Sequence, residues 1–205
     1  MLLNRRQLSV AVVASDDPSR PSLTGVCIRP DGTTEATDGH VLLRVTPSPA
    51  APAEAEFPRQ AGSPADPQVS APFILPAAAA LDIMKAIPKS RLPILEHARL
   101  ESLNGTVIFV TTDLDTTRHH EARPVEGPYP NTDQVIPEGE PVFSIGFDLG
   151  LLEHAVKAMR FGDRYQAVGR FDFYGPLRGC KITRTLPTGE RALALVMPHR
   201  IPDTL

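Results

Sequence analysis

The sequence predicts an α+β fold built from three copies of one repeat, in which a strand, a helix and three further strands follow one another. Two observations lead to this prediction: the same order of apolar patterns occurs in each third of the chain, and turn sequences separate the expected strands at matching places. The helices are expected to lie on one face of antiparallel sheets. With 205 residues, 41% of them hydrophobic, the chain is long enough to bury a core in such repeats.

The last third of the chain shows the repeat most clearly. Apolar residues alternate along 141–147, which predicts a strand, and Asp148 is a typical N-cap for the helix expected next. Three strand-like segments follow, separated by the turns GPLRG and PTG. The apolar stripe of the helix is predicted to comprise Leu151, Leu152, Ala155 and Met159.

The middle of the chain repeats this order, with a helix predicted for AAAALDIMKAI and a hairpin at Asn104-Gly105. The beginning fits as well, with a short strand MLL, a helix RRQLSVAVVAS, and turns at Asp31-Gly32 and Asp38-Gly39. Recurrence at roughly sixty residues favours a modular fold.

Two domains are expected from these repeats. Residues 1–137 would form one domain of two repeats, and residues 141–205 would form a half-domain of one repeat. The stretch 46–72 is rich in Pro and Ala and shows no helical or alternating period, so it is expected to be a mobile surface loop or linker. Phe57, its one aromatic residue, would either anchor this linker or lie exposed.

Composition argues against several classes of function. A formal net charge of -3 argues against a protein that coats nucleic acid by bulk attraction, and the lack of Trp argues against single-strand binding by stacking. The N-terminal apolar stretch is short and contains Arg5 and Arg6, so neither a signal peptide nor a membrane span is expected, and the default location is the cytoplasm. Cys27 and Cys180 lie far apart and are expected to be reduced and semi-buried.

A metal-binding or catalytic site is not expected. One dense group of potential metal ligands comprises Asp113, Asp115, His119 and His120, and strand alternation would place the first three on one face. A polar outer strand accounts for the same residues, while a metal-dependent hydrolase is the enzymatic alternative. Because GxSxG, HExxH and Gly-rich phosphate loops are missing from the sequence, we predict no enzyme activity and no cofactor.

Three short segments carry a more specific signal: ATDGHVLLRV (36–45), YPNTDQVIPEG (129–139) and ALVMPHRI (194–201). Together and in this order they resemble the bacterial DNA polymerase III beta subunit, the DNA sliding clamp. That family has a Thr-Asp-Gly-His segment, an aromatic-Pro-Asp/Asn segment and a C-terminal Val-Met-Pro-x-Arg segment in the same succession. The resemblance implies a shortened member of the family, in which 1–137 is similar to its middle domain and 141–205 to the second half of its third domain.

In the family, these segments form a pocket between the second and third domains, which receives short linear motifs of DNA polymerases, the clamp loader and repair proteins. The sequence departs from the family at Val41 and Gln134, where basic residues are common, and at His199, where an apolar residue is usual. Carried over by position, the pocket would be lined by Thr37, Gly39, His40, Val41, Leu42, Pro130, Gln134, Val135, Val196, Met197, Pro198 and Arg200.

Local features of the sequence fit such a pocket. The turn at Asp38-Gly39 places His40 and Leu42 at the start of a strand, and Met197 is a deformable apolar residue next to a proline. The alternative is that Met197 only ends a core strand together with Val196, and that Asp38-Gly39 only forms a hairpin turn. The residues alone leave both interpretations open.

The resemblance also implies contact with duplex DNA. In the family, helices line a ring and present Lys and Arg to the phosphates without reading the bases. A solvated helix face shows a similar scatter of basic residues, so this alternative stands beside DNA contact. The corresponding candidates here are Arg5, Arg6, Lys85, Lys89, Arg91, Lys157, Arg160 and Arg164.

The resemblance therefore implies a non-catalytic processivity factor or docking platform that acts as a homo-oligomer, with clamp-binding motifs and duplex DNA as partners. If three repeats per chain tile a ring of twelve, four chains would close it. The alternative is a clamp-fold adaptor or competitor that binds the same peptides without encircling DNA.

Overall fold

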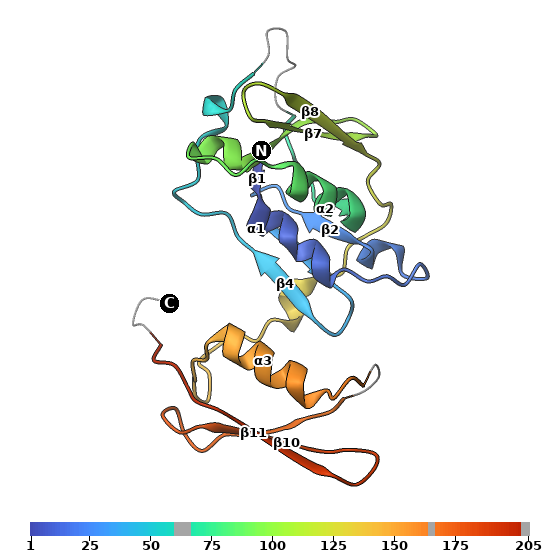
Figure 1. Ribbon diagram of the computed structural model, residues 1–205. Coiled ribbons are helices and arrows are strands. Elements are labelled where there is room, and N and C mark those ends of the chain that lie inside the picture. The colour runs from blue at the N-terminus through green and yellow to red at the C-terminus, as the bar shows by residue number, and fades with distance from the viewer. Residues whose placement is uncertain (60–66, 164–166, 202–205) are drawn as a thin grey trace. The chain divides into compact units, whose positions relative to one another are not determined.

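The computed structural model describes residues 1–59, 67–163 and 167–201, and the chain divides into two units, Met1–Val135 and Ile136–Leu205. The N-terminal unit holds two β-α-β-β-β repeats, and the C-terminal unit holds the third helix and three further strands (Figure 1). Each unit has a hydrophobic core of its own.

Repeat 1 begins with a short strand that leads directly into a helix. Asn4 caps this helix: its side chain accepts hydrogen bonds from the backbone N–H groups of Arg6 and Gln7, while the Gln7 side chain accepts one from the N–H of Asn4. After one turn the helix continues as a 3₁₀ segment, Ser9–Val13. The regular elements of repeat 1 are β1 (Leu2–Asn4), α1 (Arg5–Leu8), β2 (Gly25–Ile28), β3 (Thr34–Thr37) and β4 (Leu42–Val45).

Repeat 2 has the same order and a longer helix. Alanine has the highest helix propensity, and a run of four alanines opens this helix directly after Pro76. The helix ends at Ala86, two residues before Pro88, which cannot continue it. The regular elements of repeat 2 are β5 (Phe73–Pro76), α2 (Ala77–Ala86), β6 (His97–Leu103), β7 (Val107–Thr112) and β8 (Thr117–Ala122). Short 3₁₀ turns occur at Pro21–Leu23, Glu54–Glu56, Pro93–Glu96 and Thr132–Val135.

The two repeats exchange their first strands. One sheet has the order β1-β6-β7-β8 and the other the order β4-β3-β2-β5, so β1 completes the sheet of repeat 2 and β5 completes the sheet of repeat 1. Both contacts are antiparallel, with Leu3 opposite Ala98 and Leu75 opposite Val26. Neither repeat of the N-terminal unit therefore forms its sheet alone.

The core of the N-terminal unit is shared in the same way. Helices α1 and α2 lie side by side in Figure 1 and contact one another. Burial of apolar side chains from both repeats in one cluster ties the repeats together, since removing them from water is the main favourable term in folding. The fully buried members include Leu3, Leu8, Ile28, Leu75, Ile83, Leu100 and Phe109.

Part of the Pro- and Ala-rich stretch is pinned to the N-terminal unit. Phe57 is buried, and the Arg99 guanidinium lies 5.7 Å from the centroid of its ring. Glu54 pairs with the N-terminal amine of Met1 at 2.6 Å. Phe57 therefore anchors this stretch, of which 60–66 lie outside the described residues.

In its described residues, the C-terminal unit has a single helix packed on a three-stranded antiparallel sheet of order β11-β10-β9. Asp148 caps the helix as predicted, by accepting a hydrogen bond from the N–H of Leu151 at 2.9 Å. The segment 141–147, predicted as a strand, makes one isolated bridge, from Gly146 to His199. The regular elements are α3 (Leu149–Met159), β9 (Arg170–Asp172), β10 (Cys180–Thr185) and β11 (Arg191–Val196).

The core of the C-terminal unit is small. Its buried residues are Met159, Cys180, Ile182 and Val196, and the partly buried side chains against them include Phe147, Leu152 and Ala155. Leu151 is 61% exposed, so its assignment to the apolar stripe was wrong. The stripe is narrower than predicted because three strands cover only part of the helix surface. Within the described residues, no helix has the length and apolar character needed to cross a membrane.

The three repeats recur at a constant spacing. The residues that cap their helices, Asn4, Pro76 and Asp148, are 72 residues apart at both intervals. The period is longer than the sequence patterns suggested because it includes the long connections between repeats. Positions can therefore be matched by adding 72, which makes Leu8, Ala80 and Leu152 equivalent.

This equivalence gives a test of how completely each core is formed. Leu8 is fully buried, whereas Leu152 is only partly buried. We expect Leu8→Ala to cost about 2–5 kcal/mol of the free energy of unfolding of the N-terminal unit, and Leu152→Ala to cost less than about 2 kcal/mol in the C-terminal unit. Urea unfolding followed by hydrogen exchange resolves the two units, and equal losses would contradict this picture of unequal cores.

Candidate functional site

The Thr-Asp-Gly-His segment forms a tight turn at the end of β3. The Thr37 hydroxyl accepts a hydrogen bond from the N–H of Gly39 (3.0 Å), and the Asp38 carboxylate accepts from His40 and Val41 (both 2.8 Å). The bond from Val41, and next that from His40, lowers the pKa of the Asp38 carboxyl. Gly39 has φ of +95°, which a side chain would strain. The turn is thus fixed by its own residues and exposes His40 and Val41 while Thr37 is buried.

A buried glutamate ties the segment 129–135 to the same sheet. Glu35 lies on β3 and is 1% exposed. Its carboxylate accepts hydrogen bonds from the Thr132 hydroxyl (2.7 Å) and from the guanidinium groups of Arg29 (2.9 Å) and Arg44 (2.7 Å). Two of the three family-like segments, 36–45 and 129–139, are therefore joined through one carboxylate.

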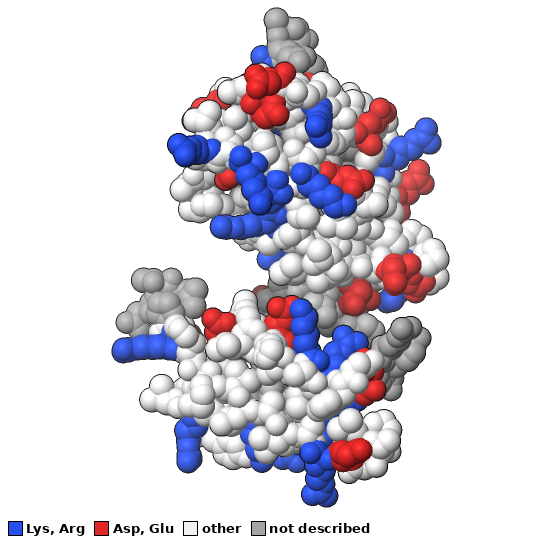
Figure 2. Space-filling view, viewed as in Figure 1, with Lys and Arg blue, Asp and Glu red and all other residues white. Residues whose placement is uncertain are grey.

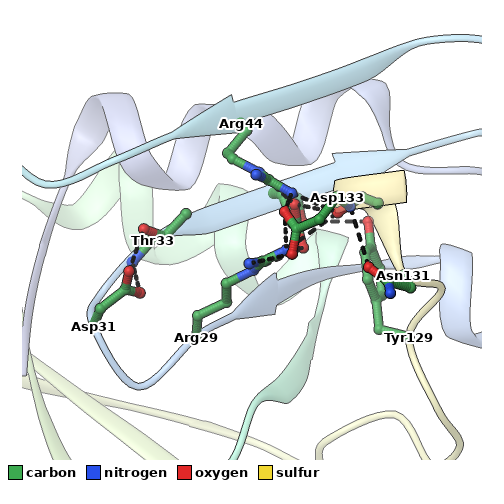
Figure 3. A network of polar contacts seen from close by, with 9 residues as sticks. Arg29, Asp31, Thr33, Arg44, Tyr129, Asn131 and Asp133 are labelled. Atoms are coloured by element: carbon green, nitrogen blue, oxygen red, sulfur yellow. Dashed lines mark hydrogen bonds and ion pairs between the residues drawn. The ribbon is translucent and has the colours of Figure 1, made fainter. Parts of the chain in front are cut away.

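Asp133 completes this network from the solvent side. Its carboxylate lies 3.1 Å from Arg29 and 2.7 Å from Arg44, so each guanidinium bridges two carboxylates (Figure 3). Arg29, and next Arg44, lowers the pKa of the Asp133 carboxyl, and Asp133 in turn raises the pKa of Arg29. Two positive and two negative groups balance in formal charge, which offsets the cost of burying Glu35.

A hollow of about 780 Å³ opens beside the network, within the N-terminal unit. Burial raises the pKa of the Tyr129 hydroxyl and raises that of the Cys27 thiol to about 11, so both groups are protonated at neutral pH. Pro130 is the predicted peptide contact that lines this hollow, whereas Gln134 and Val135 are exposed nearby in the chain. The apolar lining comprises Pro72, Phe73, Ile74, Pro124, Val125, Pro128, Tyr129 and Pro130, and Arg29, Glu35 and Asp133 form a polar edge.

The third family-like segment belongs to the C-terminal unit, where it ends β11. Val196 is buried in the core of that unit, opposite Cys180, so it has the role of a core strand residue. Met197 next to it is 59% exposed, Pro198 is half-buried and Arg200 is exposed. Of the four predicted contacts in this segment, Met197 offers the largest accessible apolar side chain.

Four basic residues line a second hollow of the N-terminal unit, of about 350 Å³. Arg5, Lys85 and Lys89 are predicted DNA contacts, and Arg118 of β8 joins them. The Arg5 guanidinium donates to the carbonyl of Ile87, and its Nε is buried without a hydrogen-bond partner among the described residues. Figure 2 shows Lys and Arg side chains gathered over the face that carries α1 and α2.

The remaining predicted DNA contacts are more dispersed. Arg6 and Arg91 are exposed on the N-terminal unit. In the C-terminal unit, Lys157 pairs with a neighbouring glutamate at 2.7 Å, and Arg160 is exposed at the end of α3. Arg164 lies outside the described residues.

The group considered as a metal site is dispersed as well. Asp113 and Asp115 lie in the turn between β7 and β8, and His119 Nδ1 is 3.0 Å from the Glu101 carboxylate. His120 hydrogen-bonds a threonine of β7 instead. In the described part of the chain, no group of three or more His, Cys, Asp or Glu side chains is arranged to hold a metal ion.

The residues that hold the site together are not among the predicted contacts. Glu35 and Arg44 lie directly opposite each other on β3 and β4. The hairpin turn at Asp38-Gly39 fixes that register, so their pairing was a signal available in the sequence. The contribution of Thr132 had no such signal, because it lies 97 residues from Glu35.

Solved structures share this architecture. The DNA polymerase sliding clamp of Bacillus subtilis matches with a TM-score of 0.68 and 16% identity, over 97% of this chain and 48% of that one. The clamp of Pseudomonas aeruginosa matches with 0.68 and 16%, over 97% and 50%. The DNA polymerase III beta chain of Streptococcus pneumoniae matches with 0.66 and 18%, over 98% and 49%. This chain has the DNA sliding-clamp fold.

The fold match confirms the predicted fold class and the resemblance on which it rested. The chain spans about half the length of these clamp neighbours. The sequence itself matches no protein-family model and no curated protein, so the likeness to sliding clamps is carried by the fold.

The role of the buried Glu35 in holding the N-terminal unit together can be tested by removing its carboxylate. Glu35→Ala would leave two half-buried guanidinium groups without their central acceptor, and we expect a loss of about 3–5 kcal/mol in the free energy of unfolding. Urea unfolding at neutral pH measures this loss, and hydrogen exchange in 129–135 should rise with it. The exposed Glu121→Ala on β8 is the control and should change stability by less than about 0.5 kcal/mol; equal effects of the two variants would contradict the role of Glu35.

Proposed function

We propose that this chain is a non-catalytic, clamp-like processivity factor or docking platform that binds short peptide motifs of replication or repair proteins in the presence of duplex DNA. The observation that carries the proposal is the fold match to DNA polymerase sliding clamps over 97% of the chain. The neighbours are twice as long, so the partners and the mode of action are part of the proposal.

Accessible apolar side chains support peptide binding. Val41 and Val135 are exposed on the N-terminal unit, and Met197 is exposed on the C-terminal unit. Each belongs to one of the three family-like segments. An apolar hollow with Pro130 in its wall and a polar edge resembles the mixture of contacts by which proteins hold the side chains of a peptide.

Peptide binding is tested by placing a carboxylate on each unit separately. An unpaired carboxylate in an apolar contact is costly, so Leu42→Asp and Met197→Asp should each weaken binding at least tenfold. The measurement is fluorescence anisotropy with a labelled synthetic peptide that carries the clamp-binding motif of a bacterial replicative polymerase. Val168→Asp is the control, because Val168 is 79% exposed and lies beside Thr185 and Arg191, at the end of β10 and β11 opposite to Met197. Unchanged binding in both test variants would rule out these contacts.

DNA binding is proposed for the basic hollow of the N-terminal unit. Each Lys or Arg that neutralises a phosphate releases counterions, so replacing Lys85, Lys89 and Arg118 by Gln should weaken association with duplex DNA and flatten its dependence on log salt by about 2 to 3. Anisotropy with a labelled duplex at varied salt measures both quantities.

The control for this experiment carries the same change in net charge. Arg20, Arg123 and Arg178 lie outside the basic hollow, and replacing all three by Gln should leave most of the association intact. If the unsubstituted protein shows no salt-dependent association with duplex DNA, the proposal of a DNA-contacting face fails.

A clamp-fold adaptor that never encircles DNA is the second candidate, and the exposed apolar side chains of Val41, Val135 and Met197 support it equally, because peptide contact does not need a ring. The two candidates differ in topology. Encirclement predicts retention on closed circular DNA and loss after linearisation, whereas an adaptor behaves alike on both.

A further inference from the structure

The first strand of a repeat uses both of its edges in the N-terminal unit. On one edge, β5 pairs with β2 of the other repeat. On its second edge, the carbonyl of Ile74 accepts a hydrogen bond from the N–H of Val125 at 2.8 Å. Val125 follows the last strand of the same repeat, β8, by three residues. A complete first strand therefore has one partner inside its own repeat and one in a neighbouring repeat.

Repeat 3 reproduces the contact inside the repeat. The carbonyl of Gly146 accepts a hydrogen bond from the N–H of His199 at 2.8 Å. Gly146 stands two residues before the helix cap, as Ile74 does, and His199 follows β11 by three residues, as Val125 follows β8. The segment 141–147 therefore already has the position of a first strand.

The contact with a neighbouring repeat is the part that repeat 3 lacks. Within the described residues, β9 pairs with β10 alone, and its other edge has no strand beside it. In the N-terminal unit, the carbonyl of Met1 accepts from the N–H of Leu100 on β6, the second strand of the other repeat. Ile145 stands where Met1 does, three residues before the cap. Because backbone groups alternate in direction along a strand, Ile145 and Phe147 present theirs to the edge opposite His199.

Apolar side chains near this edge are exposed to solvent. Leu149 is 79% exposed and Leu151 is 61% exposed. Their equivalents in repeat 2, Ala77 and Ala79, pack against the core that repeats 1 and 2 share. Repeat 3 thus has large apolar residues exposed at positions that a neighbouring repeat covers elsewhere in the chain. Further partly exposed apolar residues near this edge are Phe171 on β9 and the pair Phe143 and Phe173, whose ring centroids lie 5.8 Å apart within the chain.

We propose that two copies of this chain associate through their C-terminal units, each adding its segment 141–147 to the β9 edge of the other around a two-fold axis. The pair would have the strand exchange that repeats 1 and 2 show within one chain. This proposal goes beyond the proposed function and does not rest on it.

The register of the contact follows from the N-terminal unit. There, Leu2 lies opposite Arg99, so Met1, one residue earlier, comes opposite Leu100. In the same way, Phe73 lies opposite Ile28. In each repeat, one residue of the second strand pairs with the residue that lies three positions before the end of the third strand. This second-strand residue is Ile28 in repeat 1, Leu100 in repeat 2 and Phe171 in repeat 3. Ile145 of one copy is therefore expected opposite Phe171 of the other.

A second copy suits this edge in charge and area. The segment 141–147 carries no charged residue, and Arg170 and Asp172 of β9 neutralise each other at 2.8 Å. A two-fold axis supplies each open edge with the strand it lacks, so both are satisfied at once. The exposed Phe and Leu side chains offer about 500 Å² per copy before the strand backbones are counted, against roughly 800 Å² per partner in a stable interface.

The first experiment measures the solution mass of the full chain by light scattering from about 1 µM to about 300 µM. The mass is expected to reach an even multiple of the 22.2 kDa chain. Leu149→Lys combined with Leu151→Lys should weaken this association at least tenfold without unfolding the unit, since both side chains are exposed in the single chain. The control is Leu193→Lys, at a residue 65% exposed on β11, the strand furthest from β9 in the sheet, which should associate as the unsubstituted chain does.

The second experiment tests the register. Ser144 and Asp172 of opposite copies should form a non-hydrogen-bonded pair, in which Cα atoms are about 4.5 Å apart and a disulfide can close. Ser144→Cys with Asp172→Cys should therefore cross-link into dimers under mild oxidation at least tenfold more than Ser144→Cys with Thr188→Cys. A chain that stays monomeric at every concentration overturns the proposal. So does an oligomer that ignores the Leu149 and Leu151 substitutions and cross-links equally in both cysteine variants, because its interface would lie elsewhere.

Discussion

The first strand of each repeat lies outside the sheet formed by its own three later strands, and this constraint organises the whole structure. In the N-terminal unit, β1 and β5 solve it by exchange, because each completes the sheet of the other repeat. The exchange also merges the two sets of apolar residues into one core, in which Leu8 and Ile83 are almost fully buried. In repeat 3 the same segment makes one bridge, and its core is correspondingly small. The size of each core thus follows from whether a neighbouring repeat is present.

A buried ion network adds a second level of order to the N-terminal unit. Glu35 has almost no solvent exposure, so its charge is tolerated only because two guanidinium groups and a hydroxyl surround it. Such a network contributes geometric definition more than net stability, because desolvation offsets much of the attraction between the charges. Its effect here is positional: it holds the segment that contains Pro130 against β3 and β4, where the apolar hollow opens.

Much of this fold could be predicted from local patterns. The cap at Asp148 and the turn at Asp38-Gly39 are short-range features, and the structure has both. The three family-like segments led to the clamp fold, which the solved structures confirm. The exchange of first strands could not be predicted, because it depends on pairing between residues about 95 positions apart, such as Leu3 and Ala98. For the same reason, the exposure of Leu151 was missed: a helical pattern shows which residues share a face, but not how far a sheet extends over it.

An odd number of repeats has a consequence that an even number does not. Two repeats satisfy each other inside the N-terminal unit, so the third has no partner of its kind in the described chain. Two chains joined at repeat 3 would contain six repeats, all with completed sheets, and a ring of twelve would need two such pairs and a further contact between them. In this proposal, oligomer formation and ring closure are separate steps. The open edge of β9 would supply the first, whereas the second would need a surface for which strand pairing in the described residues gives no counterpart.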